Sequence, residues 1–292
     1  MAQYIITHTT EYNYQEPIGL CQNIARLTPR NFYGQTCLHS EIIIDPLPDV
    51  LNSYDDFFGN HLTYYAIEQE HKKLRVTVRS HVEIVKMQWE AGTMPQTPWE
   101  DTISMLWANN QENIEIRQFV AHTAMTGFSP EIRDYAQKSF MPGRPLFYAA
   151  QALMQSIFHD FEFKPGATTV ATPVDEVLRL RKGVCQDFAH LAIACVRSMG
   201  LPARYMSGYI ETTTEPGKEK LIGADASHAW FSVFIPGIGW VGFDPTNNQI
   251  PSHQHITVAW GRDDADIAPL KGVIQSSRPH KLFVAVSVEK VK

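Results

Sequence analysis

The sequence predicts an α+β protein in which an N-terminal antiparallel β-sandwich or barrel precedes a core of helices packed on an antiparallel sheet. Three observations predict this fold. Apolar residues alternate with polar ones up to about residue 85, recur every three or four residues between about residues 129 and 199, and alternate again toward the end. A stretch rich in proline, glycine and threonine separates the first two zones and is typical of a linker.

The N-terminal zone contains three clear strands. In residues 74–85, leucine and valines alternate with charged and polar residues, which is the pattern of a half-buried antiparallel strand. Residues 37–46 and 61–69 also have the composition of strands. Two prolines and the pair Gly59 and Asn60 supply turn residues between them, so an all-β first domain follows.

The domain boundaries are placed where the period changes. We assign residues 1–90 to an N-terminal β domain, residues 91–100 to the linker and residues 101–292 to the second, α+β domain. A chain of 292 residues is long enough for two domains of ordinary size.

The second domain begins with helices and continues with strands. Residues 129–140 open with a serine cap, a proline and an early glutamate, and residues 145–163 carry apolar residues every three or four positions. A further helix is predicted over residues 184–199, ending at Gly200. The strands predicted after it, all assigned to this domain, are residues 203–211, 228–235, 239–245, 255–261 and 281–290.

The charge pattern excludes several classes of partner. The 25 basic and 31 acidic residues are scattered without long blocks of one sign, which excludes a nucleic-acid footprint or an acidic membrane as partner. The first residues lack a basic leader and an apolar segment, and no run approaches the roughly 18 apolar residues of a membrane helix. We therefore expect a cytoplasmic protein.

The four cysteines suggest reduced thiols and no cofactor. Cys185 and Cys195 lie ten residues apart on one predicted helix, which separates them by roughly 15 Å and excludes a disulfide between them. Cys21 and Cys37 could pair, but a lone bridge is not expected in a chain without a signal sequence. The spacing of cysteines does not suggest structural zinc, and no metal or other cofactor is expected.

Cys185 is placed at the expected start of a helix, where unpaired N–H groups and the macrodipole favour a thiolate. Its own backbone N–H could also donate to an oxyanion. Cys195, in the middle of the same helix, has none of these features and is expected to be core. Position alone leaves Cys185 open to the same interpretation, because buried free cysteines are common.

A histidine and an aspartate on the following strands strengthen the catalytic hypothesis. If the apolar residues of both strands cover one core, His228 and Asp244 share the opposite face. A hairpin centred on Pro236 puts them directly across from each other, within hydrogen-bond reach. Taken singly, His228 could be a sheet-packed histidine, and Asp244 could form an Asx turn before Pro245.

Several motifs resemble the bacterial transglutaminase-like proteins, whose core is similar to papain-type enzymes and eukaryotic transglutaminases. These motifs are "GVCQDFAHLA", "HAWFSVFIPGIGWVGFDPTNN" and "GRDDADIAP", and the N-terminal stretches "IARLTPR" and "DDFFGNHL" resemble the β-rich domain that precedes this core. The resemblance implies Cys185 as nucleophile, His228 as general base and acid, and Asp244 as the residue that orients the histidine. Asp264 departs from the pattern, because the family commonly has a tyrosine after "GRD".

The expected function is thiol-dependent acyl transfer or hydrolysis at an amide bond of a protein or peptide, through a thioester. Hydrolysis is favoured over transfer because water needs no second dedicated site. Trp230, Trp240 and Gln186 are expected to line the substrate cleft, although Gln186 follows the cysteine and does not match the oxyanion glutamine of papain-type enzymes. His190 is expected to be structural or to lie at the rim.

Two alternatives remain open at this point. The chain could be a non-catalytic binding module that kept this fold, although a scaffold has no need of the three residues. It could also be a zinc hydrolase that uses His228, His253 and His255, since two histidines in H-x-H spacing can share one face of a strand. The identity of the substrate and the oligomeric state do not follow from the sequence.

Overall fold

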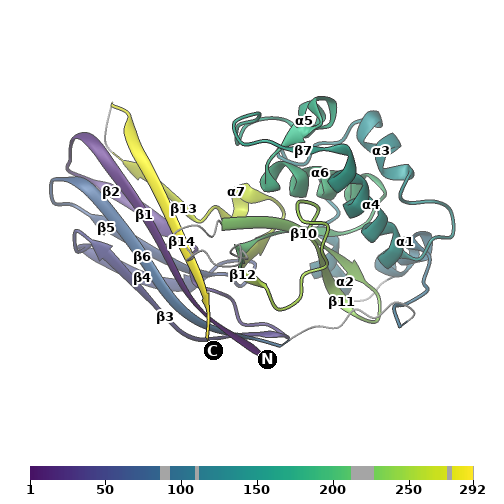
Figure 1. Cartoon of the computed structure of the whole chain (residues 1–292), viewed down its shortest axis with the longest axis horizontal. Helices are drawn as coiled ribbons and strands as arrows, with labels where there is room; N and C mark the ends of the chain where they lie inside the picture. Colours follow the sequence, from purple (N-terminus) through teal and green to yellow (C-terminus); the bar gives the residue numbers. More distant parts are fainter. Residues whose placement is uncertain (86–92, 109–111, 212–226, 275–277, 292) are drawn as a thin grey trace, which may run out of the picture.

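The computed structural model describes residues 1–85, 93–108, 112–211, 227–274 and 278–291. In it, two four-stranded antiparallel sheets form a sandwich next to a mixed helix and sheet unit (Figure 1). The first sheet has the order β14 (His280–Lys290), β1 (Ala2–Ile18), β6 (His71–Ile84) and β3 (Gln35–Asp45). The second has the order β13 (Leu270–Ile274), β2 (Cys21–Ala25), β5 (His61–Ile67) and β4 (Val50–Asp55).

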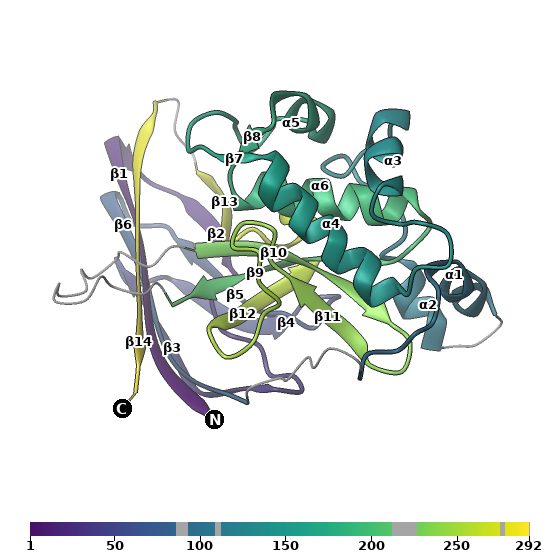
Figure 2. The same ribbon diagram turned by 45° about the vertical axis from the view of Figure 1, so that its right-hand side comes forward.

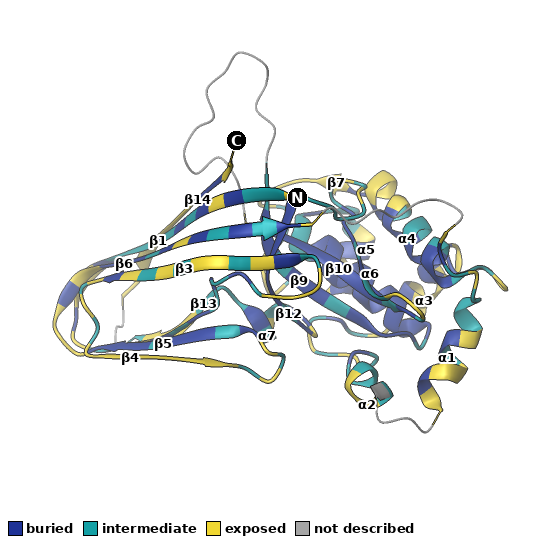
Figure 3. Cartoon of the chain, turned by 90° about the horizontal axis from the view of Figure 1, so that it is seen from below, coloured by how far each residue is buried: buried dark blue, intermediate teal, exposed yellow. Residues whose placement is uncertain are grey.

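The sandwich buries one face of each sheet, as the alternating sequence predicts. On β6, Leu74, Val76 and Val78 are buried, and they pack against Tyr65 and Ile67 of β5 in one apolar cluster. Alternate residues on the other face are exposed or half-buried (Figure 3). The predicted α+β class and the antiparallel N-terminal sheets are therefore confirmed.

The last two strands return to the sandwich, which corrects their predicted placement in the second domain. β14 pairs antiparallel with β1 from Tyr4 opposite Lys290 to Tyr14 opposite His280, and β13 pairs with β2. The alternation in residues 281–290 predicts a strand but carries no information about the sheet that it joins, and no strand is predicted from the sequence at the position of β13. Of the predicted linker, residues 91 and 92 lie outside the described residues, residues 93–98 connect to the first helix, and residues 99 and 100 already belong to that helix.

The second unit is a four-stranded antiparallel sheet with helices on one side (Figure 2). Its order is β11 (Gly239–Phe243), β10 (Ser227–Ile235), β9 (Ala203–Ile210) and β12 (His255–Gly261). The helices are α1 (Trp99–Trp107), α2 (Glu112–Arg117), α3 (Pro130–Gln137), α4 (Leu146–Asp160), α5 (Val174–Leu180), α6 (Cys185–Ser198) and α7 (Asp264–Ile267). A short parallel pair, β7 (Glu162–Phe163) and β8 (Lys182–Gly183), precedes α6.

The helix α6 is the centre of this unit, because it contacts α3, α4 and α5 as well as β9 and β10. Almost all of its residues after the first two are buried, as Figure 3 shows. Beneath it, Ala229, Phe231 and Val233 of β10 face the helix layer, and Phe231 stacks on Phe243 with ring centroids 5.5 Å apart. The alternate residues of β10, which include His228 and Trp230, therefore face the opposite side of the sheet.

The sandwich is joined to the outer strand β12 through two side-chain amides. Gln35 donates to the carbonyl oxygen of Thr257 over 2.7 Å and accepts from the Thr257 N–H over 2.8 Å. Asn60 makes the equivalent pair of bonds with the backbone of Trp260, each of 2.9 Å. These amides satisfy the free edge of β12 as a neighbouring strand would.

In the described part of the chain, none of the helices combines the length and the apolar character that a membrane-spanning segment needs.

Candidate active site

Cys185 lies at the start of α6, in a turn that a carboxylate holds in place. Asp187 accepts hydrogen bonds from the Val184 N–H over 2.8 Å and from the Thr168 hydroxyl over 2.6 Å. A side chain at Gly183 would bring its Cβ to 2.7 Å from Asp187 Oδ2, so the close approach requires glycine. This packing fixes the first turn of the helix and leaves the cysteine half-buried.

Cys195 differs from Cys185 as the sequence predicts. It is fully buried, its Sγ lies 3.8 Å from the carbonyl oxygen of Ile132, and burial raises the pKa of its thiol strongly. All four cysteines are free in the structure.

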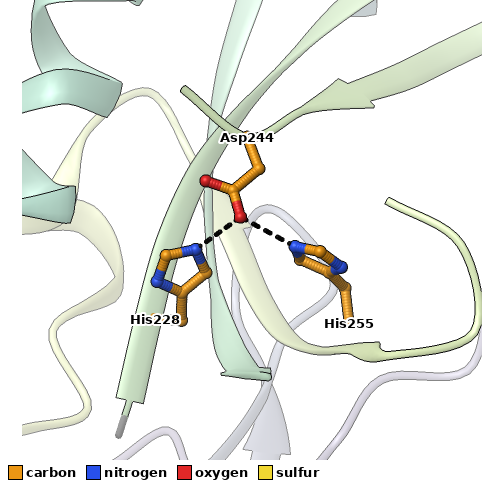
Figure 4. A group of neighbouring side chains, drawn as sticks. All are labelled: His228, Asp244 and His255. Atoms are coloured by element: carbon orange, nitrogen blue, oxygen red, sulfur yellow. Dashed lines mark hydrogen bonds and ion pairs between the residues drawn. The ribbon is translucent and has the colours of Figure 1, made fainter. Parts of the chain in front are cut away.

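His228 and Asp244 lie together on the same side of the sheet (Figure 4). His228 Nε2 donates to Asp244 Oδ2 over 2.8 Å, and both residues are buried. The predicted register is wrong by two residues: Phe231 pairs with Phe243, so the hairpin is centred on Gly237 rather than Pro236. Gly237 has a φ of +84°, which glycine adopts readily in such a loop. A shift of two residues keeps every side chain on its predicted face.

Asp244 is held by its own loop, and it forms the Asx turn as well as the contact with histidine. Its Oδ1 accepts from the N–H groups of Thr246 and Asn247, over 3.0 and 3.2 Å. Its Oδ2 accepts from Asn247 Nδ2 over 2.8 Å in addition to His228. Backbone bonds between Asp244 and Gln249 close the loop. The two alternatives for Asp244 therefore coexist, one on each oxygen.

His255 is a third partner of this carboxylate that the triad hypothesis missed. Its Nε2 donates to Asp244 Oδ2 over 2.9 Å (Figure 4), and its side chain is buried. The H-x-H spacing in the sequence indicates this residue only as a possible zinc ligand. Its role beside Asp244 depends on the pairing of β12 with β9, which the sequence does not reveal.

The electrostatics of the cluster favour a charged His228. Burial disfavours the imidazolium, but hydrogen bonds and charge interactions with Asp244 and Cys185 outweigh it and raise the pKa of His228 from 6.5 to about 10. Burial of Asp244 is likewise outweighed by hydrogen bonds from His228 and His255, so its pKa lies well below the ordinary value. For His255 burial dominates and lowers the pKa, so this ring is neutral at pH 7.

Asp244 and Cys185 are thus the two groups whose interactions raise the pKa of His228. Because Nε2 is bonded to Asp244, the other ring nitrogen, Nδ1, is the one available to Cys185. The arrangement provides a half-buried thiol at a helix start, a histidine beside it and a carboxylate behind the histidine. Chemically, such a set can form and resolve a covalent acyl intermediate.

The other predicted residues lie in different places. Trp230 and Trp240 line a cavity whose described walls do not include Cys185 or Gln186, and Gln186 is half-buried beside the cysteine. Their assignment to a substrate cleft therefore stays a prediction. His190 is buried, its Nε2 accepts from the Asp264 N–H over 3.1 Å, and burial lowers its pKa to about 4, which fits the expected structural role.

One group in the described part of the chain has metal-binding composition. The ligand atoms of His228, Asp244 and His255 lie within 4.8 Å of one another. His253 does not belong to this group, and its Nδ1 instead lies 3.2 Å from the Ser252 hydroxyl. Both oxygens of Asp244 already accept hydrogen bonds, so a cation there would have to replace several of them.

Comparison with known proteins decides the family. The model of the bacterial transglutaminase-like N-terminal region matches residues 4–83, and that of the transglutaminase-like superfamily matches residues 133–245. An uncharacterized protein of Mycobacterium tuberculosis is 38% identical over 296 residues, covering 99% of this chain and 92% of that relative. The chain belongs to the bacterial transglutaminase-like family.

Other members and neighbours extend the likeness. A protein-glutamine gamma-glutamyltransferase of Pseudomonas aeruginosa is 31% identical over 136 residues, which are 41% of this transglutaminase-like chain and 20% of that enzyme. The crystal structure of a proposed cysteine protease from Cytophaga hutchinsonii has a TM-score of 0.75 and 20% identity, covering 100% of this chain and 92% of that one. At this identity the neighbour shows that the transglutaminase-like fold is shared over the whole chain.

Proposed function

We propose that this protein catalyses thiol-dependent acyl transfer or hydrolysis at amide bonds of proteins or peptides. The observation that supports the proposal most is the bond of His228 to Asp244 over 2.8 Å, together with the interaction with Cys185 that helps to raise the pKa of His228. Family membership supports the same chemistry, because a glutamyltransferase is among the relatives.

The proposed first step is attack of the Cys185 thiolate on an amide carbonyl carbon. A C–S bond forms, the carbonyl π electrons move to oxygen, and the tetrahedral intermediate collapses with loss of the amine. The imidazolium of His228 donates its Nδ1 proton to the departing nitrogen. The product is a thioester on Cys185, and Asp244 keeps the ring in the orientation and tautomer that this transfer needs.

The proposed second step resolves the thioester. Water or an amine attacks the acyl carbon, His228 takes its proton, and the thiolate leaves. The first N–H groups of α6 have no partners within the helix and could stabilise the oxyanion in both steps. We favour water as the acceptor, on the argument that hydrolysis requires no second binding site.

The zinc-hydrolase alternative now involves a different set of ligands, and it makes a prediction that differs from that of the thiol mechanism. The residues that could hold zinc are now His228, Asp244 and His255 rather than the two histidines of the H-x-H spacing. In the thiol mechanism these residues orient and move protons, so dialysis against a chelator should leave activity unchanged. Loss of activity that zinc restores would favour the metal hydrolase.

The proposed function is tested by trapping the acyl-enzyme. The protein is mixed with casein peptides, quenched in acid and digested, and mass spectrometry searches for an acyl group on Cys185. We expect an acyl adduct on Cys185 that is absent from Cys185→Ala and preserved in Cys37→Ala, a control at another half-buried thiol. Release of ammonia would indicate side-chain amides as substrates, and shortened peptides would indicate backbone amides. Product formation by Cys185→Ala would contradict the proposal, and a wild-type protein that forms neither adduct nor product would favour the binding module.

A further inference from the structure

The cavity lined by Trp230 and Trp240 lies on the face of the β9–β12 sheet that is turned away from α6. It has a volume of about 490 Å³, within the range of small-molecule sites. The aromatic residues Trp230, Trp240 and Trp260 line it, together with Met206, Arg204 and His255. Its described walls include neither Cys185 nor His228 nor Asp244, and it adjoins the proposed catalytic site through His255, which bonds to Asp244.

Its first unusual feature is a buried acceptor without a donor. His255 is 5% exposed, and its Nε2 must carry the ring proton because the Asp244 carboxylate only accepts. With the proton on Nε2, Nδ1 is the ring nitrogen left to accept a hydrogen bond. Among the described residues this atom has no hydrogen-bond partner. Buried acceptors are nearly always paired in proteins, so this one is available to a ligand.

The second feature is a half-buried cation that forms no ion pair with a described residue. The guanidinium of Arg204 lies 3.8 Å from the ring centre of Trp240 and 4.7 Å from that of Trp260. Burial, and to a smaller extent the charge of Arg30, outweigh the opposing charge of Glu115 and lower the pKa of Arg204 to about 9, which still leaves it charged at pH 7. In the described part of the chain it forms no ion pair, and its Nε has no hydrogen-bond partner.

Arg197 shows how this protein satisfies an arginine that serves only the structure. Its guanidinium donates to four acceptors: the carbonyl oxygens of Phe119, Ala203 and Arg262 and the hydroxyl of Thr126. The guanidinium of Arg204 instead contacts the aromatic rings of Phe119, Trp240 and Trp260, and no described residue accepts a hydrogen bond from it. A stacked guanidinium that still has its donors free is suited to binding a carboxylate in two-point geometry.

The register shows that these two features lie at opposite ends of an elongated site. His255 pairs with Ile210 of β9. Ile210 lies six residues along β9 from Arg204, so the Cα atoms of His255 and Arg204 are separated by roughly 20 Å along the strand. Between them the register places Met206, with Trp230 on one neighbouring strand and Trp260 on the other. A ligand that spans this cavity therefore needs an apolar body between two polar ends.

We propose that this cavity binds an elongated apolar carboxylic acid whose far end carries a hydroxyl or amide N–H. The carboxylate pairs with Arg204, the apolar body packs against the tryptophans, and the donor bonds to Nδ1 of His255. The proposal does not rest on the thiol chemistry.

The test measures binding in the Cys185→Ala protein, so catalysis plays no part in it. The probes are 10-hydroxydecanoate, decanoate and decan-1-ol, followed by tryptophan fluorescence and isothermal titration calorimetry. We expect all three probes to bind saturably, with affinity decreasing from 10-hydroxydecanoate through decanoate to decan-1-ol. The affinity of decan-1-ol should be at least about tenfold lower than that of decanoate. This comparison needs no further variant, and so it does not depend on how a substitution affects folding.

Two substitutions locate the site. Arg204→Met should weaken both acids about tenfold and leave decan-1-ol unchanged, whereas Arg179→Met, at an exposed arginine of α5, should change nothing. His255→Phe should reduce the affinity for 10-hydroxydecanoate to that for decanoate. Equal affinity of decanoate and decan-1-ol for the unsubstituted cavity, absence of saturable binding, or equal weakening by Arg179→Met would overturn the proposal.

Discussion

At the scale of single residues, the decisive feature is one carboxylate shared by several donors. Asp244 accepts from His228, His255 and Asn247 on one oxygen and from two backbone N–H groups on the other. These bonds keep it ionised and fixed in orientation. The fixed negative charge in turn keeps a proton on His228 well above the ordinary pH range of histidine.

This coupling predicts a loss of stability on the alkaline side. The pKa of His228 is about 10 in the folded protein against an ordinary value of 6.5. Its contribution is therefore complete below about pH 6.5 and disappears as the pH rises toward 10. Between pH 7 and 9 we expect the free energy of unfolding in urea to fall by about 1 kcal/mol per pH unit more in the wild type than in His228→Gln. Parallel curves for the two proteins would contradict the raised pKa.

At the scale of elements, the sequence predicted most helices and strands of the second unit. It missed the features that depend on which strands pair with each other. The strand faces were correct because alternation fixes them: His228 and Asp244 share a side even though the hairpin register is shifted by two residues. The start of α6 was also predicted, from the glycine and the apolar run that follow one another there. His255 was missed as a partner of Asp244, because its position depends on the long-range pairing of β12 with β9.

The same pairing makes one glycine necessary. Gly208 lies opposite His228, and a Cβ there would come within 1.9 Å of the carbonyl oxygen of Ile256 in β12. The register of β12 against β9 is irregular close to this point, between Thr257 and Ala259. A side chain at residue 208 would therefore force these two strands apart below the proposed catalytic histidine.

We expect Gly208→Ala to lower the free energy of unfolding by about 3 kcal/mol or more, because backbone must move to admit the methyl group. Gly127→Ala is the control, since a Cβ at that position meets nothing within 4 Å. Urea denaturation followed by circular dichroism measures both. Similar stabilities of the two variants would show that β12 does not hold the close contact with β9.

At the scale of the whole molecule, the N-terminal sandwich and the second unit form one continuous structure. One end of the sandwich contributes Tyr4, Ile6, Val82 and Val288 to the same apolar core as α6. The return of β14 to pair with β1 encloses the helical segment between two strands of one sheet. This closure could not be predicted from local patterns, because it pairs the two ends of the chain.

The amide contacts to β12 test whether the sandwich supports the site. Gln35→Ala leaves the Thr257 N–H of β12 without a partner, because the Thr257 carbonyl still accepts from the Arg30 N–H, and Asn60→Ala removes the bonds of its amide to the N–H and C=O of Trp260. Each variant should lose about 1–3 kcal/mol of unfolding free energy. Asn52→Ala, at an exposed residue of β4, serves as control and should cost far less. If the first two variants were no less stable than the third, the contacts would not support β12.

The most direct measurement of the central claim is the pH dependence of iodoacetamide alkylation at Cys185, read by mass spectrometry of the modified peptide. If His228 holds the sulfur as an ion-paired thiolate, the rate should stay level from about pH 5 to pH 8. In His228→Gln the rate should instead rise steadily toward about pH 8.5, as for an ordinary thiol. A wild-type rate that rises in the same way as the variant would contradict the claim that His228 activates Cys185.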